Sequence, residues 1–248
     1  MPVDAQEISS LRARAAPVVI LTGAGISRES GLHTFRDPDG IWATVRLEDV
    51  ATPEAFAEDP GRVHAFYNAR RRALLDPQIA PNPAHHALAR LEHAWPGPVV
   101  VVTQNIDDLH ERAGTWSDAL IHMHGELLKM RCARCGDIAP VKGDLTVDRT
   151  CPGCGLAGGL RPHVVWFGEM PLAMDRIHTA LAEAQLFVAV GTSGNVWPAA
   201  GFVREVPADC LTVELNLEPS EGTARFRRAA HGPAGKLVPA LVDRLCPR

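Results

Sequence analysis

The fold class of this 248-residue chain is decided by one stretch, Pro17-Val-Val-Ile-Leu-Thr-Gly-Ala-Gly-Ile-Ser27. It begins as a short apolar run rich in β-branched side chains, which is typical of a strand buried on both faces of a parallel sheet. The run leads into Gly23-Ala-Gly25, where glycines let the backbone approach a phosphate group and the next helix N-terminus stabilises its charge. Position 28 is arginine, where the dehydrogenase fingerprint has its third glycine. The turn therefore indicates either an unusual dinucleotide site or a plain strand-to-helix connection.

Similar apolar runs recur along the chain, at residues 98–103, 186–190 and 211–215. Each run ends in a polar or glycine-containing turn, and helical patterns lie between the runs. This alternation predicts an α/β fold with a doubly wound parallel sheet. Ligands bind such sheets beyond the carboxyl ends of the strands. We therefore expect a site near Gly23, Gln104, Gly191 and Asn216.

Two stretches interrupt the alternation. Residues 37–97 have helical patterns and proline-rich loops, and residues 126–163 contain paired cysteines and many glycines. We expect both stretches to build a second, smaller domain. Segments 1–36, 98–125 and 164–248 would then form the larger, Rossmann-type domain.

The four paired cysteines indicate a metal site. Cys132-x-x-Cys135 and Cys151-x-x-Cys154 are separated by fifteen residues, a spacing at which two knuckles present four thiolates tetrahedrally to zinc. Four thiolates leave no open coordination position, so we expect a structural zinc ion. The alternative is reduced or disulfide-bonded pairs.

Composition and charge exclude several classes of function. The net charge of −4 disfavours direct binding of nucleic acid, even though a zinc ribbon alone can be a nucleic-acid module. We find no apolar run long enough to cross a membrane and no signal peptide. The sequence therefore predicts a cytoplasmic protein.

Two polar segments could carry chemistry. Gln104-Asn105-Ile106-Asp107 follows a predicted strand, and its amide and carboxylate groups suit a ribose and a carboxamide, although a polar capping turn explains them equally well. In an extended His122-Met-His-Gly-Glu126, the two histidines and Glu126 would share one face. That face could hold a second metal ion or supply one general base.

The helix expected after Pro60 places an arginine on an apolar stripe, formed by Val63, Phe66, Tyr67, Arg70 and Leu74. A buried arginine needs an anionic partner. That partner is either an internal carboxylate or one that arrives with the substrate, because arginine and a phenol together bind carboxylates well. We expect Arg71 and Arg72 to point progressively toward solvent.

Taken together, these segments resemble the sirtuin family, in particular its bacterial class III members. The resemblance rests on Gly23 to Ser27, Ser30-Gly31, Thr34-Phe-Arg36, Thr103 to Asp107, His122 to Gly125, the four cysteines, Arg161 to Glu169, Gly191 to Ser193 and Glu214 to Glu218. They occur in the family's order over residues 17–240. Arg28 and Trp197 depart from the residues common in the family.

The resemblance implies a Rossmann-type domain with a zinc-ribbon and helical domain, and NAD as a co-substrate. It implies that His124, not His122, is the catalytic base. The cofactor would be bound by Gly23, Ala24, Gly25, Ser27, Phe35, Arg36, Trp42, Gln104, Asn105, Ile106, Asp107, Gly191, Thr192, Ser193, Asn216, Leu217, Glu218 and Ala234. The acyl-lysine peptide would lie against Val165, Phe167 and Gly168, and Tyr67 with Arg70 would bind the distal carboxylate of acidic acyl groups.

The activity implied is NAD-dependent removal of acetyl, succinyl and malonyl groups from lysine, with release of nicotinamide and O-acyl-ADP-ribose. The expected partners are acylated proteins or peptides, neither nucleic acid nor membrane, and the expected state is a monomer. Two rival functions remain, mono-ADP-ribosyl transfer to proteins and NAD sensing without catalysis.

Overall fold

A six-stranded parallel sheet forms the larger part of the protein. In the computed structural model, which describes residues 3–32 and 45–247, the strand order is β3-β2-β1-β7-β8-β9. The strands span Val18–Thr22 (β1), Val99–Thr103 (β2), Leu120–His122 (β3), Leu186–Val190 (β7), Leu211–Asn216 (β8) and Arg228–His231 (β9). The sheet confirms the predicted doubly wound α/β fold.

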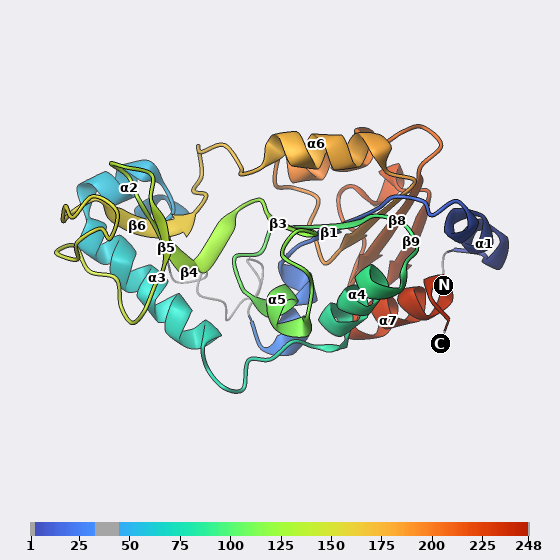
Figure 1. The fold of residues 1–248 in the computed structure, drawn as a ribbon, viewed down its shortest axis with the longest axis horizontal. Coiled ribbons are helices and arrows are strands. Elements are labelled where there is room, and N and C mark those ends of the chain that lie inside the picture. Colours follow the sequence, from blue (N-terminus) through green and yellow to red (C-terminus); the bar gives the residue numbers. More distant parts are fainter. Residues whose placement is uncertain (1–2, 33–44, 248) are drawn as a thin grey trace.

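Helices cover both faces of this sheet, as Figure 1 shows. One face packs against α1 (Ala5–Ala13), α4 (Pro83–Ala94) and α7 (Ala234–Leu245). The other packs against α6 (Met174–Glu183) and the short helix η5 (Ala199–Arg204). β1 and β7 are buried at every position, which explains why their sequences are continuously apolar rather than alternating.

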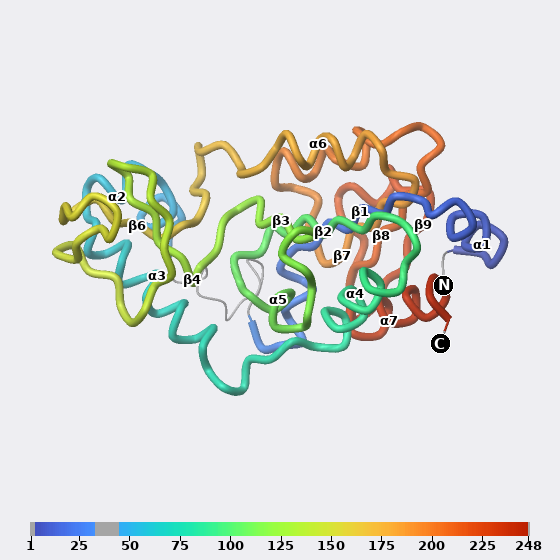
Figure 2. Tube along the Cα trace, viewed as in Figure 1, coloured from blue at the N-terminus to red at the C-terminus, as the bar shows by residue number. Residues whose placement is uncertain are grey.

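A smaller part lies at the left of Figure 1. It contains α2 (Pro53–Glu58), α3 (Pro60–Leu74) and the antiparallel sheet β5-β4-β6. Its strands span Gly125–Cys132 (β4), Ile138–Pro140 (β5) and Leu160–Val164 (β6). In Figure 2 the chain leaves the large sheet after β3 to enter β4, and returns after β6 to α6.

The position of α4 bears on the domain boundaries. Its side chains Ala84, Leu88 and Leu91 belong to the core beneath the large sheet, and α4 packs against α7. The expected small-domain segment 37–97 included this helix. We propose instead that the boundary lies between α3 and α4, with 126–163 kept in the small domain.

Two local expectations are wrong. Arg71 does not point toward solvent: its side chain is 2 % exposed and donates to Asn68 Oδ1 at 2.8 Å, because α3 buries a second face against the segment at Leu145. His122 to Glu126 is not one extended segment, since β3 ends at His122 and β4 begins at Gly125 after a turn.

Candidate active site

The turn after β1 packs closely against the turn after β7. The Gly23 N–H donates to Val190 O at 3.0 Å, and the Gly25 N–H donates to Gly191 O at 2.9 Å. Gly191 has φ +63, and a Cβ atom there would lie 2.4 Å from the Ile26 backbone nitrogen. Only glycine fits this contact, so the two strand ends lie together at one edge of the sheet.

Three predicted cofactor residues meet in a buried cluster. Ser27 Oγ donates to Asp107 Oδ2 at 3.0 Å, and Asn105 Nδ2 donates to Ser27 Oγ at 3.1 Å. Burial raises the pKa of Asp107, while the Leu109 N–H and the Ser27 hydroxyl oppose that rise. The cluster offers an amide, a hydroxyl and a carboxylate, which can hold a carboxamide.

A second chain of hydrogen bonds joins β2, β7 and β8. Gln104 Nε2 donates to Thr192 Oγ1 at 3.0 Å, and Asn216 Nδ2 donates to Thr192 O at 2.7 Å. The predicted residues at the four strand ends are therefore brought to one edge of the sheet, as the doubly wound topology requires.

The remaining predicted cofactor residues differ in how they are placed. Ser193 follows Thr192 in the same turn, Leu217 and Glu218 are exposed just after β8, and Ala24 begins the short helix after Gly23. Ala234 starts α7, where Glu29 accepts a hydrogen bond from the Gly235 N–H at 2.6 Å.

Ile106 is partly buried and packs on the core of the small domain. Phe35, Arg36 and Trp42 lie outside the described residues.

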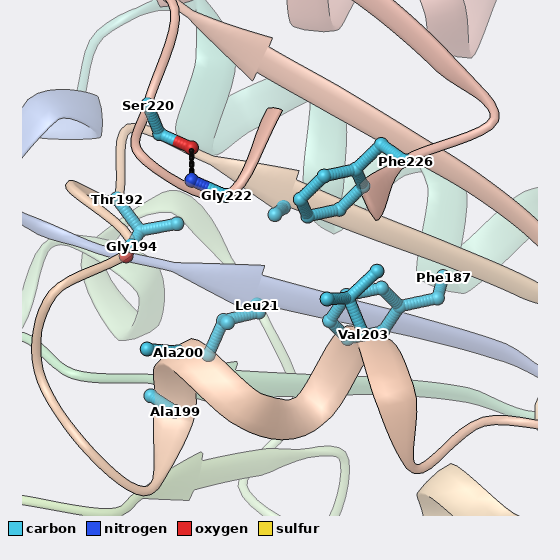
Figure 3. A pocket seen from close by; sticks show the side chains of 11 residues that line it. Leu21, Phe187, Thr192, Gly194, Ala199, Ala200, Val203, Ser220, Gly222 and Phe226 are labelled. Atoms are coloured by element: carbon cyan, nitrogen blue, oxygen red, sulfur yellow. Dashed lines mark hydrogen bonds between the residues drawn. The ribbon is translucent and has the colours of Figure 1, made fainter. Parts of the chain in front are cut away.

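A small apolar pocket lies beside this edge. Figure 3 shows Phe187 and Leu21 of the sheet facing Ala199, Ala200 and Val203, with Phe226 closing one side. The Gly222 N–H donates to Ser220 Oγ at 3.1 Å and shapes the rim. Because its lining is mainly apolar, we assign it no catalytic role.

His124 lies in the turn between β3 and β4. Its Nδ1 is 2.9 Å from Gln104 O, so Nδ1 carries the hydrogen and Nε2 has a free lone pair. Burial lowers the pKa of His124, and the bond to Gln104 opposes this. His124 is therefore neutral near pH 7 and can accept a proton.

The loop after β6 runs beside His124. The Val165 N–H donates to His124 O at 2.9 Å, the Phe167 side chain is 52 % exposed, and Gly168 has φ +87. The Glu169 carboxylate fixes this loop, because it accepts hydrogen bonds from Arg161, Arg131 and the Trp166 N–H.

Tyr67 and Arg70 lie one turn apart on α3. Trp166 Nε1 donates to Tyr67 Oη at 3.0 Å, which leaves the phenol hydrogen available to another acceptor. Burial raises the pKa of Tyr67, so the phenol stays protonated. Arg70 is partly buried, and its charge interacts with Tyr67 and Asp107. Arg70 therefore lies within electrostatic range of Asp107.

The four predicted zinc ligands converge as expected. Cys132 Sγ and Cys154 Sγ are 3.9 Å apart, and Cys135 Sγ and Cys151 Sγ are 3.7 Å apart. Four sulfur atoms at about 2.3 Å from a zinc ion in a tetrahedron would be separated by roughly 3.8 Å. The cluster therefore fits a structural Zn²⁺ with no open coordination position.

Sequence analysis missed two buried histidines behind the site. His110 Nε2 lies 3.1 Å from Thr22 Oγ1, and His85 Nε2 lies 3.5 Å from Ser27 Oγ. Burial lowers the pKa of His85 to about 4 and that of His110 well below its ordinary value. Both support residues of the strand-end turns. The sequence gives little indication of their burial, because a histidine within a helical pattern is equally consistent with an exposed position.

The fold and the site define a dinucleotide-binding enzyme with a structural zinc ribbon. The Sir2 family model matches residues 23–198. An NAD-dependent protein deacylase of Salmonella typhimurium is 56 % identical over 92 % of this chain and 83 % of its own length. A solved complex of a Sir2 homologue with NAD has a TM-score of 0.85 at 35 % identity, covering 98 % of this chain and 94 % of the other. Sir2Af2 bound to a myristoylated histone peptide has a TM-score of 0.68 at 28 % identity, covering 97 % and 96 %.

The chain belongs to the Sir2 family. This membership confirms the predicted resemblance to sirtuins, and with it the use of NAD.

Proposed function

We propose that this chain removes acyl groups from lysine side chains at the expense of NAD, and that it accepts acidic acyl groups as well as acetyl. The observation that carries the proposal is the placement of neutral His124 beside both the predicted NAD pocket, through Gln104 O, and the predicted peptide loop, through Val165. The similarity to the NAD-dependent protein deacylase of Salmonella typhimurium supports the same reaction.

Each group of residues at the site has a separate role in this reaction. Ser27, Asn105 and Asp107 would hold the nicotinamide end of NAD, and the glycine turns at Gly25 and Gly191 would admit its pyrophosphate. When bound, NAD would supply an electrophilic ribose carbon for the acyl oxygen of the substrate, with nicotinamide as the leaving group. His124 Nε2 would take a proton from a ribose hydroxyl, whose oxygen would bond to the acyl carbon as the bond from that carbon to the lysine nitrogen breaks. One water molecule would complete the O-acyl-ADP-ribose. The protein therefore needs neither an activated serine nor an activated cysteine.

The acyl range follows from Tyr67 and Arg70. A protonated phenol with its hydrogen available and a guanidinium one helical turn away suit a distal carboxylate. Hydrogen bonds to charged groups contribute about 1.5–3 kcal/mol, which corresponds to roughly tenfold or more in acyl preference. We infer a preference for succinyl or malonyl over acetyl.

Substitution of the arginine tests this preference. Arg70→Met keeps an unbranched, largely apolar stem and removes the guanidinium charge, so we expect kcat/KM for a succinyl-lysine peptide to fall at least tenfold more than for an acetyl-lysine peptide of the same sequence. Arg72→Met is the matched control, because Arg72 is exposed and pairs with Asp144. Equal losses on both peptides would show that Arg70 has a structural role.

The rival reaction, transfer of ADP-ribose to a protein, uses the same cofactor chemistry. NAD labelled in the adenosine half distinguishes the two. Deacylation releases the label as a small O-acyl-ADP-ribose, whereas transfer leaves the label on the protein.

Location and assembly remain predictions. Among the described residues, no helix is long and apolar enough to cross a membrane. We propose a cytoplasmic location because the four clustered cysteines suit a metal as thiolates, which reducing compartments favour. We propose a monomer acting on acylated proteins.

A further inference from the structure

A second group of metal-binding side chains lies outside the four-cysteine cluster. It consists of Glu111 in the middle of α5 (Leu109–Ala113), His122 at the end of β3 and Glu126 in β4. One ligand atom from each residue lies within 4.8 Å of those of the other two. The three residues come from three separate elements, so the fold, not local sequence, brings them together.

The hydrogen bonds of His122 fix which nitrogen could bind an ion. Nδ1 lies 3.2 Å from Asn105 O, a carbonyl oxygen that can only accept, so Nδ1 carries a hydrogen. Nε2 then points at Glu111 Oε1, 2.9 Å away. A cation must lie between this nitrogen and the carboxylate, and it is either a proton or a metal ion. A histidine held through Nδ1 by a carbonyl is the usual arrangement of a metal ligand.

The surroundings of this group are acidic and open. The groove beside it is lined by four carboxylates together with Ile106, Leu128, Lys129 and Pro140; the carboxylates are those of Asp107, Asp108, Glu111 and Glu126. Asp108 Oδ1 is buried and accepts no hydrogen bond from the described residues, although Arg112 Nη1 lies 3.7 Å away. Lys129 pairs with Glu126 at 2.8 Å, but its side chain is 42 % exposed and can turn away into solvent.

We propose that Glu111, His122 and Glu126 form a second binding site for a divalent transition-metal ion of the zinc, cobalt or nickel type. One imidazole nitrogen and two carboxylate oxygens suit these ions better than Mg²⁺ or Ca²⁺, which prefer oxygen ligands alone. Tetrahedral bonds of about 2.0–2.1 Å would separate Nε2 and Oε1 by roughly 3.3 Å, so the pair must open slightly. Three protein ligands leave a position for water, which the groove can admit. This inference does not depend on the proposed deacylation.

Titration with Co²⁺ tests the site in protein whose four-cysteine cluster already holds zinc. We expect one equivalent of cobalt to bind with weak visible absorption of nitrogen and oxygen ligands, while elemental analysis after dialysis still finds one equivalent of zinc. Glu111→Gln, Glu126→Gln and His122→Asn should each weaken binding about tenfold or more. Asparagine retains a donor toward Asn105 O and removes Nε2. Circular dichroism checks that each variant is folded, and Glu126→Gln, the most conservative change, serves if another does not fold.

The exposed pair His178 and Glu205 provides the matched control. Its Nδ1–Oε2 distance is also 2.9 Å, but it belongs to neither group of three or more potential ligands found among the described residues. Glu205→Gln should leave cobalt binding unchanged. The proposal is overturned if millimolar Co²⁺ does not bind, if binding survives the three substitutions, or if intense thiolate bands show that cobalt has entered the cysteine cluster instead.

Discussion

His122 and His124 are two residues apart, yet their surroundings shift their pKa values in opposite directions. His124 is buried and bonds to Gln104 O, so its pKa is lowered. His122 is also buried, but the hydrogen bond and charge of Glu111 outweigh that burial and raise its pKa. Sequence reasoning alone left both a metal site and a single base open, because Glu111 becomes a neighbour only in the folded chain.

Replacing His124 should abolish catalysis without loss of folding. His124→Asn retains a donor toward Gln104 O and removes the basic nitrogen, so we expect kcat/KM for an acyl peptide to fall about 10²–10⁴-fold. Since burial lowers the pKa of His124, the wild-type rate should decline as His124 gains a proton, with a midpoint below the ordinary histidine value of about 6.5. A midpoint above 6.5, or an active variant, would rule out this role.

At the scale of elements, the strand-end turns are constrained by close backbone contacts. Gly191→Ala would force a side chain against the Ile26 nitrogen and into a left-handed conformation. We expect NAD affinity to fall roughly tenfold or more, as measured by calorimetry. Gly114→Ala is the matched control, because Gly114 also has positive φ but has open space at its Cβ position; it should lower stability by about 1–2 kcal/mol and leave NAD affinity unchanged. Equal NAD affinity in both variants would refute the close-contact argument.

The zinc ribbon should depend on its metal. Cys151 is buried among Met130, Leu145 and Leu160, and metal binding contributes about 10–16 kcal/mol to small zinc modules. We expect Cys151→Ser to lose the zinc and melt at a lower temperature. Cys210→Ser should keep one equivalent of zinc, since Cys210 packs in the core between the large sheet and α6. Retention of zinc by the Cys151 variant would contradict the predicted ligand set.

The secondary structure was predictable where burial on both faces made the sequence uniform. The runs that became β1, β2 and β7 are apolar almost throughout, β8 alternates apolar and polar residues although every position is buried, and all four were predicted. β3 has three residues and β9 reads Arg-Ala-Ala-His, so neither carries a pattern that indicates a strand. The burial of Arg71 also escaped prediction, because the zinc ribbon supplies a second surface that helical periodicity does not reveal.

At the scale of the whole molecule, the site takes its residues from two parts of the chain with separate hydrophobic cores. One lies around the large sheet, and the other joins α3 to β4 and the Trp166 loop. The predicted NAD residues come mainly from the first and the predicted acyl residues from the second. The division into two parts was predicted from the sequence, and the place we propose for α4 rests on its packing, since its amphipathic pattern fits either core.

Acid should destabilise the molecule through its buried histidines. The pKa of His85 is about 4 in the folded state because of burial, below its ordinary value of about 6.5. The folded state therefore binds fewer protons, so stability is full above pH 6.5 and falls between pH 6.5 and 4. His85→Gln should reduce the fall in melting temperature over this range more than His86→Gln does, because burial lowers the pKa of His85 more than the charge of the exposed His86 does. Identical acid slopes for both variants and the wild type would show that His85 does not contribute.

The stoichiometry of nicotinamide release tests the central claim most directly. The protein is incubated with a succinyl-lysine peptide, with and without NAD, and mass spectrometry follows peptide and nicotinamide together. We predict one nicotinamide released for each succinyl group removed, and no removal without NAD. Removal of the acyl group in the absence of NAD, or nicotinamide release with the peptide unchanged, would contradict the account.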